Sequence, residues 1–406
     1  MTPRPPPAQN HRGLAALLAA LSAVGPFSID AYLPSMGEIG EKLHADPLAV
    51  QQTLTAYMLP FAVMTLWHGA ISDALGRRRV ILWGTALFAL ASVACALAPT
   101  IDLLLLFRAL QGMTAGAGVV VGRAIVRDRF HGAEAQRVMS QITLTFALAP
   151  AIAPVLGGWL EVLFGWRAVF VFLVLFAGTC WLLCRFMLEE TLPPERRQPL
   201  SPLFLLKSYF HVLTSRRFVA LCLTVTLNFT GFFIYVASAP VFLGQHLHVS
   251  ATGFLWLFGP ATIGMAIGSW LSGRLAGKWS PRRTLSVAFG LMGVATVWNF
   301  AFHFLHAPGL PWSVAPLTLY VLGMSLSFPT LTLLALDLFP VQRGLAASCQ
   351  AFVQTSGAAL NAILAPLVWS SVRALAVTQA VALALAFAAL LIHGWRAIPR
   401  AVHRAA

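Results

Sequence analysis

The sequence predicts an all-α membrane protein with twelve transmembrane helices arranged in two pseudo-symmetric six-helix bundles. Three observations support this prediction: an extreme composition, a regular series of apolar stretches and an internal repeat. Of the 406 residues, 58% are hydrophobic and only 10% are charged, and the mean hydropathy is +0.79. Soluble domains carry roughly 25% charged residues and cannot bury this much apolar surface. The composition therefore excludes a soluble enzyme, a disordered chain and a nucleic-acid-binding domain.

The apolar stretches define the organisation of the chain. A helix needs about 20 apolar residues to cross a bilayer, and twelve stretches of about this size follow one another. They lie near 13–36, 50–72, 80–98, 102–126, 136–161, 165–188, 216–243, 252–275, 283–305, 312–335, 345–370 and 374–395. We therefore expect a disordered cytoplasmic tail at 1–12, an N-terminal bundle at 13–188, a cytoplasmic linker at 189–215, a C-terminal bundle at 216–395 and a cytoplasmic tail at 396–406.

The basic residues predict the orientation. With the N-terminus in the cytoplasm, 22 of the 27 Lys and Arg residues fall on the cytoplasmic side and three on the other. The remaining two, Arg108 and Arg123, lie inside the fourth stretch. Because cytoplasmic loops are enriched in Lys and Arg, both termini are expected inside, and the net charge of +14 needs no nucleic acid. The five cysteines lie scattered through apolar stretches, so we interpret them as small core residues.

The two halves of the chain also resemble each other. The segment beginning at His68 aligns with the segment beginning at Ser272, at an offset of 204 residues, and Gly112 aligns with Gly323 at an offset of 211. Offsets near half the chain length indicate two parallel six-helix repeats. In one large class of transporters such repeats enclose a substrate site near the bilayer midplane.

Specific motifs lie at the expected helices. Gly69-x-x-Ser72-Asp73-x-x-Gly76-Arg77-Arg78-Arg79 follows the second stretch, and Phe107–Gly112 and Arg123–Asp128 lie in the fourth. Further motifs are Ala149–Gly158 in the fifth stretch, Ser28–Pro34 in the first and Gly165–Arg167 before the sixth. These segments resemble the major facilitator superfamily and, within it, the proton-coupled drug exporters of the bicyclomycin/chloramphenicol-resistance branch. The sequence departs from the family pattern at Ala74, where a basic residue is common, and at Ala153, where glycine is frequent.

That resemblance implies a multidrug:proton antiporter of the bacterial inner membrane. Its partners would be a small-molecule substrate, protons and membrane lipids, with no cofactor beyond the proton gradient, and we expect a monomer. The predicted function is proton-coupled efflux of small amphipathic drugs, such as phenicol-like antibiotics, by alternating access. Export of an endogenous metabolite, such as a nucleoside or an amino acid derivative, is the alternative that the sequence leaves open.

Asp30 and Arg108 are the predicted proton-coupling residues. An acidic residue inside a bilayer is costly and marks function by default, and Arg108 is permanently charged. Counting 1.5 Å per residue places both about 10 Å deep from the same side, so we expect them to pair if their helices face each other. Protonation of Asp30 would then weaken the pair and displace the substrate. The alternative is a fixed ion pair that only locks the two helices together.

A second cluster is expected at the cytoplasmic end of the N-terminal bundle. The glycines Gly69 and Gly76 allow a tight turn, Asp73 is expected to cap a helix N-terminus, and Arg77 is expected to bridge to Asp128. These charges would latch one conformation. Arg78 and Arg127 complete the predicted gate. For Arg78 the positive-inside rule alone is an equal alternative.

The fifth stretch carries an antiporter-type motif of Pro150, Pro154, Gly157 and Gly158. Small residues let helices pack closely, and we expect this face to pack against Gly264 and Gly268 of the eighth stretch, sealing a seam against proton leakage. Ordinary small-residue packing is the alternative.

The substrate cavity is expected between the first, fourth, seventh and tenth helices. Its predicted wall is aromatic and amide-rich, which suits neutral or weakly charged amphipathic molecules. The predicted cavity residues are Tyr32, Tyr57, Gln111, Asn228, Phe232, Tyr235, Gln354 and Asn361. Each of them is also a plausible packing residue. A metal site at His246 and His248 is disfavoured because acidic neighbours are lacking. A membrane enzyme is disfavoured because the sequence shows no cluster of carboxylates, histidines or a nucleophile at one interface, and a channel is disfavoured because it shows no re-entrant filter or ring of charge.

Overall fold

The computed structural model describes residues 11–130, 138, 142, 149, 152–197, 200–339, 343–393, 395 and 398. These residues form helices and short connections, with no β-strand among them, which confirms the predicted all-α class. The five cysteines are free and buried, as core residues would be.

The first half of the chain forms a bundle of long helices joined by short turns. Its helices are α1 (His11–Asp30), η1 (Leu33–Ser35), α2 (Met36–Lys42), α3 (Pro47–Leu75), α4 (Arg77–Leu97), α5 (Ile101–Arg129), an unlabelled helix Ile152–Phe164 and α7 (Arg167–Met187). Helix α1 already begins at His11, so His11 and Arg12 are helical although the sequence placed them in the tail. It ends at Asp30, close to Pro34, whose ring fixes φ and which lacks an amide donor.

The second half repeats this pattern after the linker. The linker contains η2 (Pro194–Arg196) and α8 (Pro202–Leu213). The helices that follow are α9 (Arg216–Ala237), the π-helical turn η3 (Pro240–His246), η4 (Ala251–Phe254), α10 (Leu255–Leu275), α11 (Pro281–Leu305), α12 (Ala315–Leu336), α13 (Arg343–Val368) and α14 (Val372–His393).

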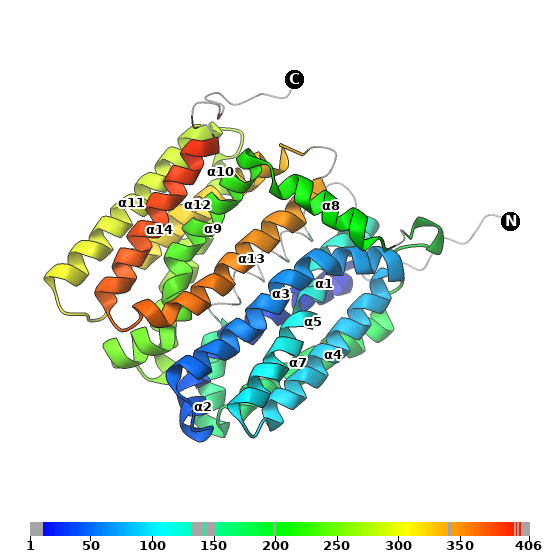
Figure 1. The fold of residues 1–406 in the computed structure, drawn as a ribbon, viewed down its shortest axis with the longest axis horizontal. Coiled ribbons are helices and arrows are strands. Elements are labelled where there is room, and N and C mark those ends of the chain that lie inside the picture. The colour runs from blue at the N-terminus through cyan, green and yellow to red at the C-terminus, as the bar shows by residue number, and fades with distance from the viewer. Residues whose placement is uncertain are drawn as a thin grey trace.

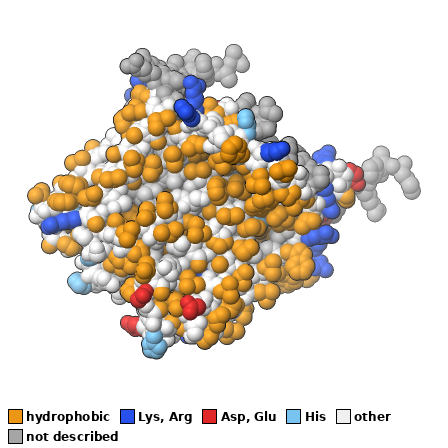
Figure 2. Space-filling model, viewed as in Figure 1, with side chains coloured by type: hydrophobic (Ala, Val, Ile, Leu, Met, Phe, Trp, Pro, Cys, Tyr) orange, Lys and Arg blue, Asp and Glu red, His pale blue; other side chains and the backbone are white. Residues whose placement is uncertain are grey.

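Eleven segments of the described chain are long and apolar enough to cross a membrane. The remaining predicted span, 136–161, lies partly outside the described residues, and its continuous described stretch, 152–161, belongs to the apolar helix Ile152–Phe164. The protein is thus a multi-pass membrane protein, and Figure 2 shows the broad hydrophobic surface that such a protein presents to lipid.

The molecule has two chemically different ends. We call the end that carries α8 and the start of α4 at Arg77 the linker end, and the end that carries Glu38 of α2 the Glu38 end; α8 and α2 lie at opposite ends of α3 in Figure 1. Lys and Arg side chains gather mostly along the α8 edge in Figure 2, and acidic side chains appear at the opposite edge.

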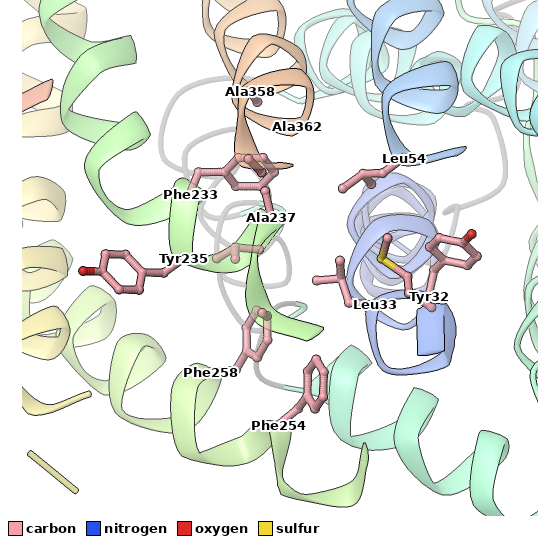
Figure 3. Close-up of a cluster of buried hydrophobic side chains, with 14 of the residues drawn as sticks. Tyr32, Leu33, Leu54, Phe233, Tyr235, Ala237, Phe254, Phe258, Ala358 and Ala362 are labelled. Atoms are coloured by element: carbon pink, nitrogen blue, oxygen red, sulfur yellow. The ribbon is translucent and has the colours of Figure 1, made fainter. Parts of the chain in front are cut away.

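The two halves share a hydrophobic cluster toward the Glu38 end. Leu33 and Leu54 of the first half pack there with Phe254 and Phe258 of the second, and Figure 3 shows these side chains converging from opposite sides. The amide Nε2 of Gln51 also donates a hydrogen bond to the carbonyl oxygen of Ala362, at 3.1 Å. At the linker end, by contrast, the apolar residues form two separate clusters, one mainly within each half. The halves are therefore closed against each other at the Glu38 end.

Candidate substrate and proton site

Arg108 lies in an aromatic cage in the middle of the first half. Its side chain is fully buried, and the guanidinium carbon lies 4.6 Å from the ring centroid of Tyr32, 4.4 Å from that of Tyr57 and 6.0 Å from that of Phe170. A cation over an aromatic face gains up to about 2 kcal/mol when both are desolvated. The rings thus replace part of the hydration that this cation loses.

Hydrogen bonds hold the same guanidinium in place. Its Nη1 donates to the carbonyl oxygen of Ser28 at 3.2 Å, to the Oγ of Ser28 at 3.1 Å and to the Oε1 of Gln111 at 2.6 Å. Gln111 in turn donates from Nε2 to the Oγ of Ser92 at 2.7 Å. The Nε and Nη2 atoms of Arg108 are buried without a hydrogen-bond partner among the described residues. The site therefore holds a fixed positive charge with unused donors.

Asp30 is buried nearby, 5% exposed, but it does not pair with Arg108. No ion pair within 4.0 Å joins these two residues, both of which the structure describes. The expected pair is therefore absent in this state. The reason is angular: the helix turns about 100° per residue, so Asp30, two positions after Ser28, projects from nearly the opposite side of α1. The sequence predicted two ionisable residues inside the first half, both of which are buried, but it did not predict the directions of their side chains.

The fifth span packs directly against the backbone beside Asp30. A Cβ atom added to Gly157 would lie 2.0 Å from the carbonyl oxygen of Ala31, so only glycine allows this approach. The predicted partner was wrong, because Gly264 and Gly268 of α10 pack instead against the carbonyl oxygens of Thr318 and Leu322 in α12.

The other residues of the fifth-span motif are only partly visible. Pro154 and Gly158 are buried in the helix Ile152–Phe164, and Pro150 lies outside the described residues. The antiport role of the motif stays a prediction.

The predicted cavity residues divide into three groups. Tyr32, Tyr57 and Gln111 gather around Arg108, as described above. In the second half, both side-chain polar atoms of Asn228 are buried without a partner among the described residues, whereas the Nδ2 of Asn361 donates to the Oγ1 of Thr230 at 3.0 Å.

The third group comprises residues that pack or that point elsewhere. Phe232 is buried in the shared hydrophobic cluster, and Gln354 is half-buried. Tyr235 belongs to the same cluster and accepts a hydrogen bond from the Nδ2 of Asn299 of α11 at 2.7 Å; Figure 3 shows its ring directed away from Leu33 and Leu54 of the first half. Phe233, which the seventh stretch also offered as a candidate, is a buried member of the same cluster. No sequence signal separates these neighbours, because α9 is apolar on nearly every face.

The charged motif at the linker end forms a compact network around Arg77. The Nη1 of Arg77 contacts the Oδ1 of Asp73 at 2.5 Å, and its Nε contacts the Oδ2 of Asp128 at 3.2 Å. Thr191 of the linker donates from Oγ1 to the same Asp128 oxygen at 3.0 Å. Arg77 thus connects the second, third and fourth spans to the linker.

Glu190 is the member of this network that the sequence analysis missed. Its Oε1 accepts the backbone N–H of Arg77 at 2.9 Å and thereby caps α4, the role expected for Asp73. A Cβ at Gly76, where φ is +98°, would lie 2.4 Å from the Oε2 of Glu190. Glu190 is 113 residues from Arg77, so no local pattern could predict this cap.

The other members of the predicted gate differ in their surroundings. Arg78 donates from Nε to the carbonyl oxygen of Leu188 at 2.6 Å and from Nη2 to that of Arg185 at 2.8 Å. Gly69 lies beside Val120. Arg127 is exposed and makes neither a hydrogen bond nor an ion pair within the described part of the chain, so it does not join the network in this state.

Two membrane bundles with buried charged residues and a charged network at one end are the arrangement that the sequence analysis expected of a transporter. The sequence profile of the Major Facilitator Superfamily matches residues 16–362 and, in a second alignment, residues 221–403. The chain belongs to this superfamily.

Several relatives agree with this assignment, and a solved structure shares the fold. The chain is 35% identical to "Uncharacterized MFS-type transporter YdgK" of Bacillus subtilis, over 89% of this chain and 90% of the relative. It is 29% identical to "Multidrug resistance protein D" of Escherichia coli over 88% and 89% of the two chains. It is also 30% identical to the "Bicyclomycin resistance protein homolog" of Haemophilus influenzae over 69% and 71%. A D-xylose-proton symporter structure shares the fold, with a TM-score of 0.71 and 13% identity, over 96% of this chain and 98% of that chain.

Proposed function

We propose that this protein exports small amphipathic drugs across the bacterial inner membrane in exchange for protons. The single observation that carries the coupling is Asp30, a carboxyl group buried within the first span without a paired cation. The names of two relatives, a multidrug resistance protein and a bicyclomycin resistance homolog, support the class of substrate. The basic linker end would face the cytoplasm, as expected for an excess of Lys and Arg.

The arrangement around Asp30 suggests how the proton acts. A charged carboxylate buried away from a cation is costly, and protonation removes that cost. In the state closed at the Glu38 end, Arg108 is occupied by the cage and by Ser28, so Asp30 lacks a cation. While the Glu38 end stays closed, a rearrangement of α1 that brings the carboxylate toward the unused Nε and Nη2 donors of Arg108 would favour release of the proton toward the linker end, which is the direction that exchange of a drug for a proton requires.

The cage also suggests what is carried. Aromatic rings and amide groups bind apolar and neutral polar surfaces, and a permanently charged Arg108 disfavours a cationic group placed next to it. Neutral or weakly acidic amphipathic compounds, phenicols among them, are therefore the expected substrates.

The test is transport in proteoliposomes with and without a proton gradient. With wild-type protein, a gradient should drive uphill movement of a phenicol, and Asp30→Asn should abolish the gradient-driven component while the protein still folds. Asp102→Asn, an exposed acid in the first turn of α5, is the matched control and should transport like wild type. Uphill transport by Asp30→Asn would refute the coupling role, and a wild type that moves only toxic metabolite analogues would refute the drug assignment.

A further inference from the structure

A basic surface cavity lies at the linker end, outside the proposed transport site. It has a volume of about 310 Å³ and is lined by residues from the start of α4, from the end of α3 and from the linker. The lining residues are Leu75, Arg78, Arg79, Leu82, Trp83, Glu190 and Arg197. Three arginines and one glutamate give it a net positive charge.

The positive charge of this cavity is only partly compensated from within, because three arginines face a single glutamate. Arg79 makes neither a hydrogen bond nor an ion pair among the described residues, and the Nε of Arg197 is buried without a partner there. The one acid, Glu190, turns its Oε1 to the backbone N–H groups of Arg77, Thr191 and Leu192, at 2.9, 3.1 and 3.0 Å. The cavity therefore offers donors to an anion from outside.

An apolar track leads away from the cavity along the outer face of α4. Trp83, on the cavity wall, is 65% exposed. It is followed by Leu87, Leu90 and Leu97, which are also exposed and lie on one side of the helix because residues three or four apart share a face. This face is part of the hydrophobic surface of a membrane-spanning helix. An anion with long acyl chains would fit both features at once.

We propose that this cavity binds the headgroup of an anionic phospholipid, with its acyl chains along Trp83 and Leu87. Arg79 and Arg197 bind the phosphate, Arg78 lines the cavity from its fixed position, and Trp83 lies at the level of the headgroup, where tryptophan is enriched. Basic pockets between membrane helices are suited to such headgroups. The site is separate from the substrate cage, so it stands independently of the proposed function.

The first test compares lipid binding by native mass spectrometry of the full-length protein in detergent. Dioleoyl phosphatidylglycerol and dioleoyl phosphatidylethanolamine, which share acyl chains, are titrated against wild type and against Arg79→Gln/Arg197→Gln. Each arginine near an anionic lipid contributes roughly a fivefold change in affinity. We therefore expect the double variant to bind phosphatidylglycerol roughly 25-fold more weakly, with phosphatidylethanolamine unchanged.

The matched control is Arg196→Gln/Arg216→Gln, which removes the same charge from two exposed arginines that do not line the cavity. Equal loss of binding in both double variants would overturn the proposal, because only the net charge would then matter. Displacement of the lipid by millimolar inorganic phosphate would also overturn it, since the cavity would then select a free anion.

A second test locates the lipid without altering any arginine. Phosphatidylglycerol with brominated acyl chains should quench more of the fluorescence of wild-type protein than of Trp83→Phe, and brominated phosphatidylcholine should show a smaller difference between the two proteins. Identical quenching of both proteins by the anionic lipid would contradict binding at this cavity.

Discussion

At the scale of single residues, Gly76 shows how one position fixes the turn between the second and third spans. Its φ of +98° lies in a region that other residues rarely adopt, and Glu190 occupies the space where a Cβ would lie. We expect Gly76→Ala to lower the free energy of unfolding by about 1–3 kcal/mol and to weaken the cap on α4. Thermal unfolding in detergent measures this effect. Gly178→Ala in α7, where a Cβ would meet nothing within 4 Å, is the control and should not destabilise the protein.

The same scale shows what sequence can and cannot predict about the site. The burial of Asp30 and Arg108 could be read from the sequence, because an ionisable residue within an apolar stretch stands out. Their mutual direction was not readable, because it depends on the rotation of α1 about its axis.

At the scale of elements, the fifth span packs at Gly157 against the backbone of Ala31, directly after the end of α1 and next to Asp30. Gly157→Ala would force a Cβ against the carbonyl oxygen of Ala31, and overpacking of this kind costs about 1–3 kcal/mol. We expect both a lower melting temperature and reduced proton-driven transport. Gly273→Ala in α10, where there is open space, should leave both unchanged. Wild-type behaviour of Gly157→Ala would mean that this contact is not needed.

The spans themselves were predictable from the sequence, because bilayer thickness imposes their length and apolar character. Which helices pack together was not. The sequence analysis paired the glycines of the fifth and eighth stretches because small residues recur at the same spacing in both. That spacing occurs on any helix face lined with small residues, so it does not identify the partner helix. Gly264 and Gly268 use theirs against α12.

At the scale of the whole molecule, the seal at the Glu38 end must open during alternating access. Gln51 and Ala362 join the two halves there. Gln51→Cys/Ala362→Cys, joined by a short bifunctional thiosulfonate reagent, should therefore stop substrate transport, and reduction should restore it. The native cysteines are all buried, so they should react little. The two single-cysteine variants, treated identically, should keep their activity, and continued transport by the cross-linked protein would show that this end need not separate.

The linker helix α8 connects the two halves at the other end. Burial raises the pKa of Tyr209 to about 12, so its hydroxyl stays protonated and donates to the carbonyl oxygen of Leu66 in α3, at 2.8 Å. On the other side, the ring of His211 packs edge-on against Phe339, with 6.2 Å between centroids. Tyr209 and His211 are two positions apart in this twelve-residue helix, so a single turn of α8 touches Leu66 of the first half and Phe339 of the second. We therefore expect that any motion separating the halves at the linker end must break one of these two contacts.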